Sequence, residues 1–323
     1  MKRILFAALM PLLLLMGNTG CNHPSPTVAN DSIDSLSLRV GVLPTLDCLP
    51  FYVAEEKGIF DTLGLGIRLF TYSCAMNCDT AFLRHQIDCA VSDIVKAQVW
   101  NIDNDSVRAL MTTNLRLYLL TSRQARIMNT ESIKEKIIAI TRNSVCDMTL
   151  DNIARSVKLG SQEVNKPQIN DFDLRMNMLV QNQYDGALLP EPYASIAQQR
   201  GARRVSDSDS FCKGLSLFVT HLSTLQQRRG DLELLVKAYN IAIDSINARI
   251  DKGQGHDILL ALPVIGVEND TTLQLSHFTH ASLPSDSSLT AARTWATGRN
   301  LIPAKKTAGQ LIDSTFVKGH NNR

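Results

Sequence analysis

Runs of residues that favour strands alternate with stretches that favour helices over most of this chain. The strand-type runs are short, rich in apolar and β-branched residues, and bounded by Pro, Gly or polar residues. The expected strands are residues 38–43, 66–72, 89–91, 107–113, 117–121, 136–141, 187–189 and 215–220. Strands that alternate with helices form sheets whose faces the helices cover. The pattern therefore predicts an α/β fold with mostly parallel sheets.

The stretches between these strands carry recognisable helix starts and ends. Pro50 suits the first turn of a helix, and Gly58 suits the left-handed position beyond its end. The segment 144–147 has the form of a capping box. Apolar residues recur every three or four positions over residues 231–250, which is typical of an amphipathic helix. The expected helices are residues 51–57, 79–84, 144–158, 174–181, 231–250 and 289–297.

Two short segments recur about one hundred residues later in the chain. Residues 86–91 resemble residues 183–188 at a shift of 97, and residues 39–43 resemble residues 137–141 at a shift of 98. Two similarly built lobes would explain both shifts. Because any two βαβ units look alike over six residues, a chance match is the alternative. Both explanations keep the α/β class.

The N-terminal segment has the composition of an export signal. Residues 1–20 begin with Lys2 and Arg3, continue with an apolar run and end in small or polar residues. Residues 21–35 begin with Cys21 and are otherwise polar, which predicts a flexible tether. The arrangement resembles a bacterial lipoprotein signal, which implies lipidation of Cys21 and a lipid anchor on the periplasmic side of a bacterial membrane. An ordinary secretory signal that leaves Cys21 as a thiol is the alternative.

The charge of the chain excludes one class of partner. It has 33 basic and 31 acidic residues, and removal of residues 1–20 would leave equal numbers. Phosphate backbones require clustered positive charge, and no basic cluster is present, so we expect no nucleic-acid partner. No apolar run after residue 20 reaches the ~18 residues that a membrane-spanning helix needs.

Four motifs are similar to those of one known family. They are Val40-Gly-Val-Leu-Pro44, the segment from Leu49 to Phe60, Gln86-Ile-Asp-Cys-Ala-Val-Ser-Asp93 and Tyr184-Asp-Gly-Ala-Leu-Leu-Pro-Glu-Pro-Tyr-Ala194. They resemble periplasmic solute-binding proteins of ABC transporters. The narrower likeness is to the group that binds nitrate, sulfonates, taurine and thiamine-pyrimidine precursors. It covers about residues 38–302.

This resemblance implies a fold and a function. The fold has two α/β lobes of the type 2 arrangement, which close like a clam on a small molecule and are joined by two crossover strands. Lobe 1 would contain residues 36–120 and 219–323, and lobe 2 residues 121–218. The implied function is solute binding for an ABC importer, with a permease and an ATPase as partners. A sensing or scavenging lipoprotein without a transporter is the alternative, followed by a pyrimidine-synthase-like or dehydratase-like enzyme.

Strand ends predict where a solute would bind. In open parallel sheets, ligands bind beyond the carboxyl ends of the strands, near helix N-termini. The expected ligand-binding residues are Thr45, Asp47, Cys48, Ser73, Cys74, Ser92, Asp93, Asn143, Ser144 and Glu191. The acids among them favour an amine, an amidine or a protonated heterocycle such as a pyrimidine, and only Arg142 is available there to pair a sulfonate. The alternative role for Asp93 is a helix cap.

The cysteines leave three possibilities open. After lipidation of Cys21, six would remain: Cys48, Cys74, Cys78, Cys89, Cys146 and Cys212. They can be small buried or pocket thiols, or form a disulfide between Cys74 and Cys78 or between the lobes. A soft-metal site of Cys74, Cys78, His85 and Cys89 can also be drawn. Its spacing differs from the tight spacing of zinc knuckles, so we assign no metal.

Motifs of the common enzyme classes are absent from the sequence. There is no G-x-S-x-G, no H-E-x-x-H, no phosphate-binding G-x-x-x-x-G-K and no G-x-G-x-x-G after a strand. We therefore expect no catalytic residue and no cofactor.

Overall fold

A computed structural model describes residues 37–104, 106–211, 213–269, 273, 275–305 and 309–317. The expected export signal, the tether, Cys21 and Cys212 lie outside the described residues. None of the described helices is both long and apolar enough to cross a membrane.

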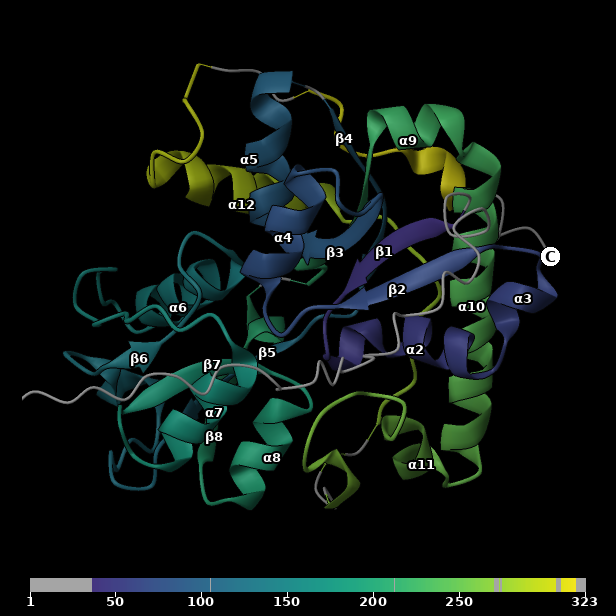
Figure 1. The fold of residues 1–323 in the computed structure, drawn as a ribbon. Helices are drawn as coiled ribbons and strands as arrows, with labels where there is room; N and C mark the ends of the chain where they lie inside the picture. Colours follow the sequence, from purple (N-terminus) through teal and green to yellow (C-terminus); the bar gives the residue numbers. More distant parts are fainter. Residues whose placement is uncertain are drawn as a thin grey trace, which may run out of the picture. The chain divides into compact units, whose positions relative to one another are not determined.

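The strands form two sheets (Figure 1). The five-stranded sheet has the order β2-β1-β3-β9-β4, and the four-stranded sheet has the order β6-β7-β5-β8. The bounds are β1 Leu38–Val42, β2 Ile67–Thr71, β3 Cys89–Asp93, β4 Val107–Thr113, β5 Leu117–Thr121, β6 Ile138–Ala139, β7 Gly186–Pro190, β8 Arg203–Asp207 and β9 Ser216–His221. This confirms the α/β class.

One strand in each sheet is reversed relative to the others. In the first sheet β9 is antiparallel to both β3 and β4, so β4 runs in the direction of β1, β2 and β3. In the second sheet β5 is antiparallel to both β7 and β8, while β6 and β7 are parallel. The reversed strands are those through which the chain enters each sheet from the other one. In each sheet all strands except one therefore run in the same direction, and the exceptions, β5 and β9, are the crossover strands.

The membership of β5 bears on the expected lobe boundaries. The sequence analysis places residues 117–120 in lobe 1, whereas Leu117–Thr121 pairs with β7 and β8 in the second sheet. Strands β4 and β5 are separated by only residues 114–116, so the sequence pattern does not mark a crossing between them. The division into lobes itself remains a proposal, with crossings at 114–116 and between β8 and β9.

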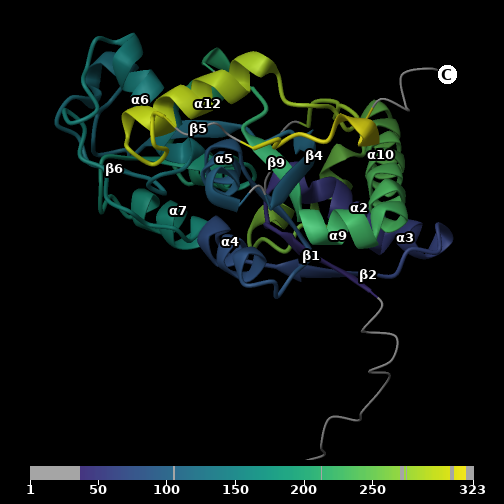
Figure 2. The same ribbon diagram turned by 90° about the horizontal axis from the view of Figure 1, so that it is seen from above.

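Helices follow most strands and pack on the sheets and on one another. Their bounds are α2 Leu49–Glu56, α3 Ile59–Thr62, α4 Ala75–Leu83, α5 Ile94–Asn104, α6 Val145–Ser156, α7 Phe172–Val180, α8 Tyr193–Gln199, α9 Leu222–Gln227, α10 Arg229–Asp251, α11 Gly255–Leu259 and α12 Asp286–Gly298. The long α10 packs against α2, α3, α9 and α11. Helix α12 contacts α5 beside the first sheet and α6 beside the second (Figure 2).

Central strands are buried along their whole length. Every residue of β3, β4, β5, β7 and β9 is buried, as expected where helices cover both faces. Gly41 in β1 is required by close packing, since a Cβ there would lie 2.4 Å from Ile87 Cδ1 and 2.7 Å from Cys78 Sγ. The first sheet therefore sits tightly against α4.

Three local expectations differ from the structure. The strand expected at 136–141 contains only β6, because Ile137 and Ile140 on either side of it form isolated bridges to a loop. The helix expected at 79–84 begins at Ala75. Strand β8 escaped the sequence pattern because its partly exposed residues are Arg, Val, Ser and Asp.

Candidate functional site

A cavity of about 760 Å³ lies at the carboxyl ends of strands from both sheets. Asp47 follows β1, Thr113 ends β4 and Glu191 follows β7, and all three line it. The chain between α11 and α12 supplies another wall through residues 276–279 and 282–285. This is the position where open α/β sheets bind ligands, and the volume suits a small molecule.

Asp47 is a buried carboxylate in the wall of this cavity. Its side chain accepts hydrogen bonds at Oδ1 from Thr45 Oγ1 (2.7 Å) and at Oδ2 from Thr113 Oγ1 (2.8 Å) and Ser216 Oγ (3.1 Å). Burial raises the pKa of Asp47, and the hydroxyl donors oppose that shift. The three side-chain donors are neutral.

Two ion pairs lie in the same wall. Arg204 Nη2 lies 2.6 Å from Glu191 Oε1, and the Arg204 guanidinium stacks 3.7 Å from the centroid of the Tyr118 ring. Arg116 forms an ion pair with Asp209. Each arginine of the wall is thus matched by a carboxylate of the wall.

A hydrogen bond joins the loops that follow β1 and β7. The backbone N–H of Leu46 donates to the carbonyl of Glu191 at 2.8 Å. Thr45 and Cys48, both expected at the site, are buried beneath it at 1% and 0% exposure. Thr45 Oγ1 lies 3.7 Å from Cys48 Sγ. Thr45 thus supports Asp47, and neither Thr45 nor Cys48 lines the cavity itself.

Ser92 and Asp93 serve the start of α5. Asp93 Oδ1 accepts from the backbone N–H groups of Val95 and Lys96, both at 2.9 Å. Ser92 Oγ donates to Asp79 Oδ1 at 2.7 Å, and Asp79 also pairs with Lys96. Asp93 therefore has the helix-cap role that the sequence left open, and neither residue is among those lining the cavity.

Asp93 should make the stability of the protein depend on pH. Burial raises the pKa of Asp93 to about 6, against about 3.9 when unfolded. Between these values the folded state binds the proton more tightly. As pH rises from 4 to 6, wild type should lose up to about 1.4 kcal/mol of unfolding free energy per pH unit relative to Asp93→Asn, and the loss should level off above pH 6 as the folded carboxyl becomes fully ionised. Urea denaturation of both proteins from pH 4 to 7 measures this, and a constant difference would contradict it.

The other expected residues lie apart from the cavity. Ser73 is exposed, and Cys74 is buried at the start of α4. Ser144 caps α6, since its Oγ accepts from the Cys146 backbone N–H at 3.1 Å. Asn143 lines a second cavity of about 410 Å³. Of the ten expected residues, the larger cavity brings together Asp47 and Glu191.

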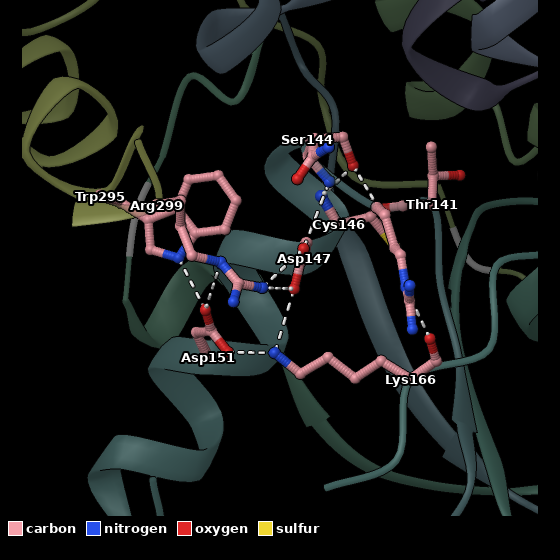
Figure 3. Close-up of polar contacts among 10 residues, drawn as sticks. Thr141, Ser144, Cys146, Asp147, Asp151, Lys166, Trp295 and Arg299 are labelled. Atoms are coloured by element: carbon pink, nitrogen blue, oxygen red, sulfur yellow. Dashed lines mark hydrogen bonds and ion pairs between the residues drawn. The ribbon is translucent and has the colours of Figure 1, made fainter. Parts of the chain in front are cut away.

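A buried charged network borders the second cavity (Figure 3). Asp147 accepts from Lys166 Nζ at 3.0 Å and from Arg299 Nη2 at 2.9 Å. Asp151 pairs with Lys166 and accepts from Trp295 Nε1 at 2.8 Å. Trp295 belongs to α12 and Arg299 directly follows it, whereas both aspartates belong to α6. The network therefore binds α12 to α6.

The described cysteines are buried free thiols: Cys48, Cys74, Cys78, Cys89 and Cys146. Burial raises the pKa of the thiols of Cys48, Cys78, Cys89 and Cys146, which disfavours the reactive thiolate. Among the described residues no group of three His, Cys, Asp or Glu could hold a metal ion. The disulfide between Cys74 and Cys78 and the soft-metal grouping are therefore not formed in the described part of the chain.

Sequence reasoning missed several residues of the cavity wall. They are Arg116, Tyr118, Arg204, Lys213 and the segment between α11 and α12. Arg116 lies just before the reversed strand β5, whose amino end shares an edge with the carboxyl ends of its neighbours. Recognition of that reversal would have indicated Arg116 and Tyr118. Basic residues other than Arg142 therefore lie near the strand ends, contrary to the expectation that only Arg142 does.

Solved structures share the fold of this chain. The zinc-bound ligand-binding component of an ABC-type import system from Staphylococcus aureus matches with a TM-score of 0.73 at 14% identity, over 87% of this chain and 98% of that one. The alkanesulfonate-binding protein SsuA from Xanthomonas axonopodis pv. citri, bound to MOPS, matches with a TM-score of 0.71 at 14% identity, over 86% and 98%. The periplasmic nitrate-binding protein NrtA from Synechocystis PCC 6803 matches with a TM-score of 0.68 at 14% identity, over 84% and 83%.

Sequence comparisons add no relative. No protein-family model and no curated protein matches the chain. The chain also matches a Candida albicans protein with a TM-score of 0.55 at 13% identity. That protein is described as having the generic periplasmic binding protein fold, the same fold that the other matches indicate. The chain therefore has the periplasmic-binding-protein fold that its sequence motifs predict.

Proposed function

We propose that the chain is the solute-binding component of an ABC importer, which captures a small molecule in the 760 Å³ cavity and delivers it to a membrane permease. The observation that carries this proposal is that loops from both sheets line one cavity. A solute that contacts both sets of loops would stabilise a closed form, which a permease could distinguish from an open one. The two connections through which the chain crosses between the sheets would act as the hinge for such closure.

The proposal includes export and anchoring. Residues 1–20 would direct export, and a lipid on Cys21 would hold the protein on the periplasmic side of a bacterial membrane. The ABC-type import system to which one of the similar structures belongs suggests a permease and an ATPase as partners. We propose no cofactor and no catalysis, because the sequence contains no motif of the common enzyme classes.

Filling the cavity should weaken solute binding. Ser276 is exposed and lines the cavity, so Ser276→Trp should lower occupancy by a co-purified solute at least about tenfold by steric exclusion. The matched control is Thr294→Trp, an exposed position on α12 outside the lining. Native mass spectrometry before and after denaturation measures the bound mass. Equal occupancy in Ser276→Trp and wild type would place the solute elsewhere.

Uptake separates the importer from a sensor or scavenger of the same fold. Deletion of the gene should reduce import of the identified solute, and the full chain should restore it. Unchanged import after deletion would exclude the transport role while leaving solute binding intact.

A further inference from the structure

The carboxylates of the larger cavity differ in how their charge is balanced. Asp47, Glu191 and Asp209 line it. Glu191 pairs with Arg204 at 2.6 Å, and Asp209 pairs with Arg116. Asp47 is held by hydroxyl groups, which supply hydrogen bonds without positive charge. Asp47 is therefore the lining carboxylate whose side-chain donors are all neutral.

Burial makes this imbalance matter. Asp47 is 3% exposed, and an ionised carboxylate out of water is costly unless a positive charge accompanies it. Hydroxyl donors offset only part of that cost. A positively charged group that enters the cavity would remove the imbalance, so the wall is complementary to a cation at this point.

The structure therefore points to a class of solute, and the inference rests on the proposed function. We propose that the solute carries a positively charged nitrogen, an amine or an amidinium, which binds the carboxylate of Asp47. Hydroxyl groups of Ser276, Thr279 and Ser282 also line the cavity and suit a polar body.

A simple anion fits the wall less well. Arg116 and Arg204 are the guanidinium groups of the lining, and each already has a carboxylate partner. A sulfonate or nitrate would have to compete with Asp209 or Glu191 for them. It would also enter a cavity that contains the carboxylate of Asp47, which repels it.

The test is a charge-sorted binding screen. Wild type, Asp47→Asn and Asp61→Asn are screened by thermal shift and titration calorimetry against small amines and amidines, their neutral amide analogues, and sulfonates of equal length. Asp61 is exposed on α3 and controls for the loss of one negative charge. We expect binding by members of the cationic set, a loss of affinity on the order of a hundredfold in Asp47→Asn, and unchanged affinity in Asp61→Asn.

Each outcome decides one of the two proposals. Binding by sulfonates or neutral compounds, or cation binding that Asp47→Asn leaves unchanged, would overturn the inference while leaving the solute-binding function in place. Failure of all three sets to bind wild type, together with no co-purified solute, would count against the function itself. A crystal structure of wild type with the tightest cation checks the contact independently of any variant. A nitrogen within about 3.2 Å of the Asp47 carboxylate is expected, and its placement elsewhere would refute the assignment.

Discussion

Replacement of Arg175 by alanine should lower the free energy of unfolding by roughly 3–5 kcal/mol, because it leaves several buried acceptors without donors. Arg175 is 1% exposed. It donates to the carbonyls of Ile169 (2.7 Å) and Leu188 (2.8 Å) and to Thr141 Oγ1 (2.6 Å). These acceptors lie on the loop before α7, on β7 and after β6, so one side chain holds three segments at the edge of the second sheet.

Chemical denaturation of wild type and variant measures this loss. The control is Arg155→Ala on α6. Arg155 is exposed and donates a hydrogen bond to Asn152 Oδ1 at 3.0 Å, so its loss should change stability by no more than about 0.5 kcal/mol. Arg175→Lys should recover part of the loss, since an ammonium can reach some of the acceptors but not all of them. A loss below about 1 kcal/mol in the alanine variant would show that water replaces the guanidinium.

Removal of Asp147 should have a similarly large effect on stability. Asp147→Ala takes away the carboxylate that both Lys166 and Arg299 contact, and Asp147 itself is 1% exposed. Breaking a buried ion pair by deleting one partner typically costs about 3–5 kcal/mol, since it leaves the other charge buried. We expect a loss in this range by urea denaturation, with faster amide hydrogen exchange in α12 than in wild type.

One further variant acts within this network, and a second serves as an exposed control outside it. Trp295→Phe removes the indole N–H that Asp151 accepts and should cost about 1 kcal/mol. Asp244→Ala breaks an exposed contact with His280 and should change stability by less than about 1 kcal/mol. Unaltered exchange in α12 after loss of Asp147 would mean that packing of α12 on α5 alone fixes the helix.

Much of the fold follows from local sequence signals, and the exceptions have physical causes. Strands β4 and β5 have the bounds predicted from the sequence, because each is rich in apolar and β-branched residues and is buried along its length. The edge strand β8 carries arginine and aspartate on a partly exposed strand, so no apolar run marks it. Reversal of β5 and β9 is a property of the pairing, which no single segment encodes.

The cavity was predictable only in part, for a similar reason. Asp47 and Glu191 follow strands that point toward it, and that rule located them. Ser92 and Asp93 are the last residues of β3, yet the Asp93 side chain caps α5 and the Ser92 side chain binds Asp79. The wall formed by residues 276–285 comes from a segment without regular structure, whose path depends on tertiary packing.

The place of β9 within the first sheet has a consequence for biogenesis. Strand β9 lies between β3 and β4 and pairs Thr220 with Cys89, 131 positions earlier in the chain. During synthesis, β4 cannot find its partner until the ribosome has passed His221. Such distant pairing slows folding. If the chain is exported as proposed, the late completion of its first sheet suits passage through a secretion channel before the sheet is whole.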